Sequence, residues 1–229
     1  MSNAGGHTPW FFPHIVCAAV CIYNREQTGN GVSIMTEQEK TVTNISIRAT
    51  YDSLEDIVGA RARDMIFRSA DMGHVLENLP EYTWEKNYTN AEQVILYYKT
   101  VDLVGPVGAQ GILRQMGYKN AEKTDQVLHL LDQFKDLPPE ERLYKGFELL
   151  KTAINRGTVE NGIEGNPQFN VHDCTMCKGV TSTKPYCSQY AGALQYFVDQ
   201  AYGKGIYQMI ETKCKAVGDD TCLFELRKR

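Results

Sequence analysis

The sequence predicts an α+β fold, in which a helical N-terminal part precedes a small antiparallel sheet packed on helices. Helix signals run almost without interruption from about residue 52 to residue 155. Residues 168–172 then alternate between apolar and polar types, as in a strand, and the last stretch of the chain is typical of a helix followed by a β-hairpin. Helices followed by strands are typical of α+β proteins, whereas α/β proteins alternate the two.

We expect one folded domain of residues 46–229, preceded by an extension of residues 1–45. The chain begins Met-Ser-Asn-Ala, which is typical of the remnant of a cleaved tag, and Met35 is a candidate for the natural start. Residues 10–23 are largely apolar but contain proline and histidine. This stretch is too short for a membrane span, which needs about 20 apolar residues. We therefore expect no membrane association.

The elements of the helical part are predicted in order. Residues 45–49 alternate and predict a short strand, and Asp52 or Ser53 begins a helix that ends near Gly73. Gly117 is expected to end a helix, and Pro139 to begin one at its first position. Four further helices are predicted, over residues 91–101, 108–116, 119–135 and 139–155.

The C-terminal elements follow a change of character after Gly157, where a glycine-rich segment begins. A strand is predicted over 168–172, a helix over 186–201, and two hairpin strands over 206–213 and 221–227. Three glycines earlier in the chain are spaced in threes and lack a preceding strand, so they predict a tight helix–helix contact and no dinucleotide site; they are Gly105, Gly108 and Gly111.

Four residues of the C-terminal part have the spacing of a closed metal site: Cys187, Glu211, Cys214 and Cys222. Three thiolates and one carboxylate suit a borderline-soft ion such as zinc, and four protein ligands leave no position for water, so the expected role is structural. Strict strand alternation would place Glu211 and Cys214 on opposite faces. Both can be ligands only if a bulge or an early strand end occurs near Lys213.

A second thiol pair, Cys174 and Cys177, lies in the segment VHDCTMCKG together with His172. Three functional interpretations remain open: a redox dithiol, a second metal site, or part of an iron–sulfur cluster that borrows Cys187. A turn with one buried thiol explains the same pattern without any function.

Composition narrows the class of protein. The net charge of −4 gives no electrostatic reason to expect nucleic acid as a partner. Seven cysteines are an odd number, which argues against a secreted disulfide framework and favours a reducing, cytoplasmic location. No nucleotide-binding, hydrolase or metalloprotease motif occurs in the chain. The sequence therefore assigns no catalytic residue.

Residues 185–226 resemble the C-terminal signature of the 4-vinyl-reductase domain family, which includes hydrocarbon-binding proteins and the sensor domains of aromatic-responsive transcription activators. The family is similar in fold to a subunit of the vesicle-tethering particle and usually forms dimers. The resemblance implies that Cys187, Glu211, Cys214 and Cys222 hold a structural zinc ion. It also implies a binding pocket, expected between the sheet and the helices.

The preferred hypothesis is a zinc-stabilised homodimer that binds a hydrophobic or aromatic small molecule. Tyr190, Phe197, Tyr207 and Met209 are candidates for the pocket, and each is equally compatible with an ordinary core position. One alternative is an enzyme or accessory protein in the reduction of a tetrapyrrole vinyl group, for which the chain shows no nicotinamide or flavin fingerprint. The other alternative is a structural adaptor that binds a protein partner.

Overall fold

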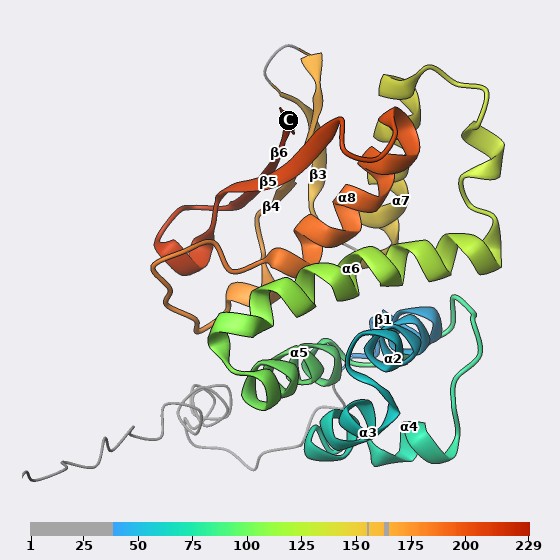
Figure 1. Ribbon diagram of the computed structural model, residues 1–229, viewed down its shortest axis with the longest axis vertical. Helices are drawn as coiled ribbons and strands as arrows, with labels where there is room; N and C mark the ends of the chain where they lie inside the picture. The colour runs from blue at the N-terminus through green and yellow to red at the C-terminus, as the bar shows by residue number, and fades with distance from the viewer. Residues whose placement is uncertain (1–38, 155, 163–164) are drawn as a thin grey trace, which may run out of the picture. The chain divides into compact units, whose positions relative to one another are not determined.

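The computed structural model describes residues 39–154, 156–162 and 165–229, and Gln38–Arg229 form one compact unit. Met35, the apolar stretch of residues 10–23 and most of the expected extension lie outside the described residues. The described part is α+β, as predicted: a layer of helices lies on one side of the long helix α6, and two helices with a four-stranded sheet lie on its other side (Figure 1).

The helical elements begin with α2 (Asn44–Val58) and continue with α3 (Ala60–Ser69), α4 (Gly73–Glu77), α5 (Asn90–Val104) and α6 (Pro106–Leu128). A short η1 turn (Asp132–Phe134) leads to α7 (Pro139–Ile154), which follows the predicted helix 139–155 closely. Strands β1 (Val42–Thr43) and β2 (Lys86–Tyr88) form a small antiparallel ribbon beside α2.

The strand predicted over residues 45–49 is wrong, because α2 already begins at Asn44. Thr43 is the N-cap, and its side-chain oxygen accepts a hydrogen bond from the backbone N–H of Ser46. Asp52 therefore lies inside the helix, where it pairs with Arg48 one turn earlier at 3.0 Å. The helix ends at Gly59, whose φ of +84° an L-residue rarely adopts.

The predicted helix end at Gly117 is also wrong, because α6 continues through it to Leu128. A side chain at Gly117 would overlap the backbone carbonyl of Gln189, and one at Gly192 would overlap that of Arg114. Helices α6 and α8 (Ser188–Tyr202) therefore cross with their backbones in contact. His129, in the left-handed conformation, ends α6 well before residue 135.

The tight contact expected from the glycines spaced in threes does not exist. Gly108 and Gly111 are exposed, and an added Cβ at either would meet open space. Gly105, with a φ of +78°, separates α5 from α6. The close packing of helices depends instead on Gly117 and Gly192, which no motif marks.

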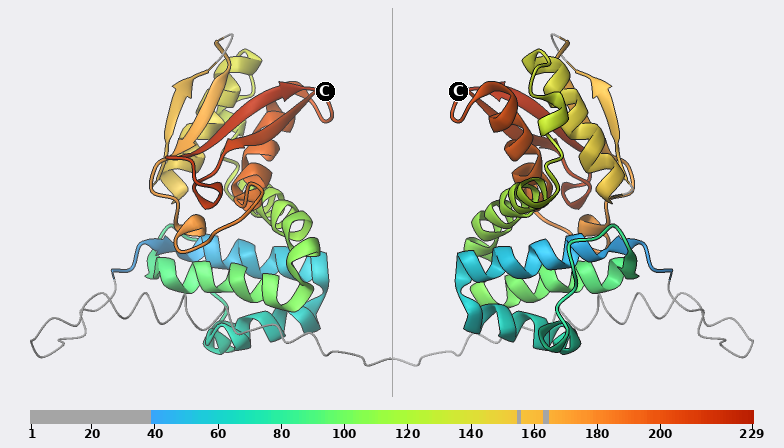
Figure 2. Two further views of the ribbon diagram at one scale, coloured as in Figure 1. Left: turned by 90° about the vertical axis from the view of Figure 1, so that its left-hand side faces the viewer. Right: turned by 90° about the vertical axis from the view of Figure 1, so that its right-hand side faces the viewer.

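The sheet has the antiparallel order β3-β4-β6-β5. Three of its strands follow the predicted ranges: β4 (Pro167–Val171), β5 (Tyr207–Lys213) and β6 (Cys222–Lys228). The fourth, β3 (Thr158–Asn161), falls in the segment interpreted only as glycine-rich and was not predicted. Figure 2 shows this sheet with α7 and α8 on one side of α6, and α2 and α5 on the other.

Helix α8 is the centre of the core. It is buried on almost every side, because it contacts α6, α7 and β5 at once. The largest fully buried side chains gather around it and its neighbours, including Phe147, Phe169 and Phe224. Among the described helices, none combines the length and the apolar character needed to cross a bilayer.

Candidate functional site

Five buried thiols converge from three segments of the chain. Cys174 and Cys177 lie at the short η3 helix (Thr175–Cys177), Cys187 is the N-cap of α8, and Cys214 and Cys222 belong to the β5–β6 hairpin. The Sγ atom of Cys177 lies 3.1 Å from that of Cys187, 3.5 Å from that of Cys222 and 3.6 Å from that of Cys214. The Cys174 Sγ lies 3.3 Å from the Cys187 Sγ.

Glu211 joins the thiols because the hairpin contains the irregularity that the sequence requires. The register of β5 against β6 shifts between Glu211 and Lys213, so Lys213 points to solvent while Glu211 and Cys214 are both buried. The Glu211 Oε2 accepts a 2.8 Å hydrogen bond from the backbone N–H of Cys187. Its Oε1 is buried and has no hydrogen-bond partner among the described residues.

Backbone groups also support the sulfurs. The N–H of Tyr186 donates to the Sγ of Cys214 at 3.3 Å, and the N–H of Lys215 donates to the Sγ of Cys222 at 3.4 Å. The N–H of Cys214 itself donates to the Asp219 carboxylate at 2.7 Å, which fixes the turn between the two strands. Hydrogen bonds that a sulfur accepts favour its thiolate form, which is the form that binds a metal.

The ionisation of the cluster reflects crowding. Burial raises the pKa of the Glu211 carboxyl to about 9. The hydrogen bond with the Cys187 thiol lowers the pKa of Cys214 to about 5, and hydrogen bonds with Cys174 and Cys177 lower that of Cys222. The pKa of Cys187 is raised, because its proton is shared with the surrounding sulfurs. These groups compete for protons, and a bound cation would let several of them ionise together.

Two sets of four residues each have ligand atoms within 4.8 Å of one another. One set is the predicted Cys187, Glu211, Cys214 and Cys222, and the other is Cys174, Cys177, Cys187 and Cys222. The pair Cys174 and Cys177 is therefore no separate site, because it packs against Cys187. One tetrahedral ion can use one set at a time, since both sets contain Cys187 and Cys222. His172 takes no part: its side chain is 62% exposed and faces Glu160.

A cavity of about 100 Å³ lies next to this cluster, on the side of the helices. Its described walls come from α2, α5, α6, α7, η3 and α8 and from connecting segments, and no strand contributes. The expected position between the sheet and the helices is therefore wrong. Apolar wall residues include Val94, Leu150, Ala193 and Phe197. A second hollow, of about 250 Å³ and more open to solvent, lies between α8 and β5.

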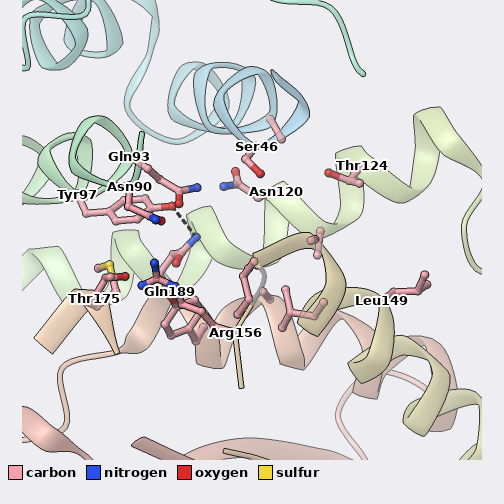
Figure 3. Close-up of a pocket in the computed structure, with 18 of the residues that line it drawn as sticks. Ser46, Asn90, Gln93, Tyr97, Asn120, Thr124, Leu149, Arg156, Thr175 and Gln189 are labelled. Atoms are coloured by element: carbon pink, nitrogen blue, oxygen red, sulfur yellow. Dashed lines mark hydrogen bonds between the residues drawn. The ribbon is translucent and has the colours of Figure 1, made fainter. Parts of the chain in front are cut away.

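Polar side chains gather at one end of the cavity, where Figure 3 shows Tyr97, Thr175, Gln189 and Arg156. The Gln189 side chain donates through Nε2 to the Tyr97 hydroxyl at 3.1 Å, whereas its buried Oε1 has no partner among the described residues. The Nη1 of Arg156 is likewise buried and without a described partner. Burial raises the pKa of Tyr97, so its hydroxyl stays protonated at neutral pH.

The candidate pocket residues separate into two groups. Tyr190 and Phe197 line the cavity. Tyr207 stacks on Tyr202 with 4.7 Å between ring centroids, and Met209 borders the second hollow, so neither lines the cavity. Sequence reasoning did not identify Arg156 or Gln189. Gln189 follows the Cys187 N-cap by two residues, which gave a signal for its position, but no signal marked Arg156.

The fold and the cysteine cluster define an α+β domain in which a thiol-rich centre joins a hairpin to the start of a helix. Crystal structures of an H-NOX protein from S. oneidensis share the fold. One, in the Fe(II)NO ligation state, has a TM-score of 0.57 and 11% identity, and the match covers 82% of this chain and 99% of that one. Another, a mutant in the Fe(II) state, has a TM-score of 0.55 and 13% identity over 82% and 97% of the two chains.

Residues 167–228 match the family model of the 4-vinyl-reductase domain, and this C-terminal segment therefore belongs to the 4-vinyl-reductase domain family. The chain is also 30% identical over 95 residues to an uncharacterized protein of Methanocaldococcus jannaschii, a match that covers 41% of this chain. The chain spans 54% of that relative's length. The resemblance stated from the sequence is confirmed, whereas no described comparison involves the vesicle-tethering fold.

Proposed function

We propose that the protein binds a hydrophobic or aromatic small molecule in the cavity among its helices, and that a structural zinc ion stabilises the domain. The main support is the cavity itself, which is walled by aliphatic and aromatic side chains and has a few polar groups at one end. Ligand sites commonly have this composition. The 4-vinyl-reductase domain is consistent with small-molecule binding.

The size of the cavity favours a small ligand. An apolar cavity of about 150 Å³ holds benzene. The cavity here, about 100 Å³, is of the same order and suits a molecule with one ring. A tetrapyrrole contains four such rings, so vinyl reduction within this cavity would require the helices to separate. This comparison is the reason to place the enzymatic alternative second.

The residues present fit a zinc ion. The Oε1 of Glu211 is a buried oxygen without a described partner, which is costly unless a cation or proton satisfies it. We therefore propose Cys187, Glu211, Cys214 and Cys222 as the ligands, with Cys174 and Cys177 packed beside them. A closed site with three sulfurs and one carboxylate oxygen would contribute to folding and would leave no coordination position for chemistry.

Metal content tests the first half of the proposal. Elemental analysis of protein purified without oxygen and without added metal should give one zinc per chain and no visible absorption. Iron with visible absorption would refute the structural zinc and would favour electron transfer through the five-thiol cluster.

Ligand binding tests the second half. Toluene and related one-ring compounds should raise the midpoint temperature of unfolding of the native protein. Ala153→Leu, which fills the cavity wall on α7, should abolish this shift. Thr152→Leu, on the exposed face of the same helix, is the matched control and should keep it. Equal shifts in both variants would show that the compounds bind elsewhere.

The resemblance also supports a homodimer in the cytoplasm. Light scattering during gel filtration would detect the dimer, and a monomer at all accessible concentrations would contradict it. A stable protein partner together with a cavity that binds none of the tested compounds would favour the adaptor alternative.

A further inference from the structure

We propose that the ligand is a small aromatic carboxylate carrying a hydrogen-bond donor on its ring, held by Arg156 and Gln189 at the polar end of the cavity. This inference rests on the proposed function and specifies the chemistry of the same cavity. It begins with two polar atoms that the protein leaves without partners among the described residues, one a donor and the other an acceptor.

The donor is the Nη1 of Arg156. This atom is buried, lines the cavity and makes no hydrogen bond among the described residues, and no described carboxylate forms an ion pair with Arg156. A guanidinium group carries its charge at every physiological pH. Burying part of it without an acceptor is costly, and a carboxylate is the acceptor whose planar geometry matches it.

Asp125, the acidic residue on the cavity wall, does not compensate for this charge. Its Oδ1 accepts a 2.8 Å hydrogen bond from the backbone N–H of Leu131, and its Oδ2 accepts a 2.6 Å hydrogen bond from the Tyr196 hydroxyl. Both oxygens are therefore engaged by the protein itself. The charge that remains available to a ligand is the positive charge of Arg156, which favours an anion.

The acceptor is the Oε1 of Gln189, a residue that is only 8% exposed. The Nε2 of the same amide is already used by the Tyr97 hydroxyl, so the amide is oriented with its oxygen free. This oxygen requires a donor, which a carboxylate lacks and a ring hydroxyl or amine supplies. The two unpartnered atoms together therefore select a molecule that carries both an anionic and a donor group.

The rest of the cavity determines the body of the ligand. Its wall is formed by side chains such as Val94, Leu150 and Phe197, and its volume of about 100 Å³ suits one ring. An inorganic anion would leave this apolar surface unfilled, and a neutral hydrocarbon would leave Arg156 unpaired. A hydroxybenzoate satisfies the charge, the acceptor and the apolar wall at the same time.

The test is calorimetric titration of the metal-containing full chain with toluene, benzoate and the three hydroxybenzoate isomers. We expect benzoate to bind about tenfold or more tightly than toluene, since a hydrogen bond to a charged group is among the stronger ones. At least one hydroxybenzoate should bind more tightly still. Arg156→Met should remove the preference for benzoate and leave the affinity for toluene unchanged, whereas Arg156→Lys should retain part of it.

Arg61→Met is the matched control, because Arg61 is exposed on α3. It should change no affinity, and metal content and circular dichroism should show that each variant is folded. If toluene binds and benzoate binds no better, the inference fails and the proposed function stands. If Arg156→Met leaves benzoate binding intact, the inference also fails. If no aromatic compound binds the native protein, both fail.

Discussion

Replacing Gly117 by alanine should destabilise the protein, although alanine is the better helix former. In an exposed helix this change stabilises by about 1 kcal/mol. Here the new methyl group would overlap the backbone carbonyl of Gln189, which cannot rotate away as a side chain can. Helices α6 and α8 would have to separate by roughly 1–2 Å to restore an ordinary van der Waals distance.

Such a separation reduces the dispersion energy along the whole crossing, because a gap of about 0.5–1 Å already removes a quarter to a half of each contact. Overpacked core sites typically lose about 1–3 kcal/mol. We expect a net loss of about 2–3 kcal/mol for Gly117→Ala, near the upper end of that range because the obstacle is backbone. For a chain of this size the midpoint temperature should fall by roughly 5–10 °C.

Gly111→Ala on the same helix is the matched control, since a Cβ there meets open space. It should raise the unfolding free energy by about 1 kcal/mol, the gain expected from helix propensity alone. Urea denaturation followed by circular dichroism measures both variants. The reasoning would be refuted if Gly117→Ala were as stable as Gly111→Ala, because the two helix backbones could not then be in contact.

The remaining predictions concern the thiol cluster and one helix cap. Cys222→Ser should abolish metal binding and lower thermal stability, because both ligand sets contain Cys222, and elemental analysis measures the loss. Cys214→Ser should do the same while Cys174→Ser keeps the metal; the reverse result would assign the all-cysteine set. Glu211→Gln, of equal size but uncharged, should weaken metal affinity in a chelator competition, and unchanged affinity would remove Glu211 from the ligands. Thr89→Ala removes the capping box of α5 and should cost about 1 kcal/mol in urea denaturation, whereas no change would mean that solvent caps the helix equally well.

The hairpin and its irregularity could be predicted because they depend on local chemistry. Glu211 and Cys214 can face one site only if strand alternation fails between them, and the register shifts at that point. The same local reasoning failed at residues 45–49, because alternation over five residues also fits a helix when apolar residues recur four apart. The Thr43 cap was the signal that decides between them.

The cavity and the helix crossing could not be predicted in this way, because they depend on residues distant in sequence. Gly117 and Gly192 are 75 positions apart, and each resembles an ordinary helix glycine until the other is known to lie opposite. Arg156 similarly lies beyond the end of α7 without any motif. Its importance follows from the absence of a described partner for its Nη1, which only the packed structure reveals.

The η3 turn belongs to both sites. Cys174 and Cys177 face the thiol cluster, and the intervening Thr175 and Met176 line the cavity, so adjacent residues of one short turn contact different ligands. A displacement of this turn therefore changes both environments together. By thermodynamic linkage, if the metal alters the affinity for the small molecule by some factor, the small molecule alters the affinity for the metal by the same factor. The stabilising ion and the cavity thus form one coupled equilibrium, in which the loading of either can be read from the other.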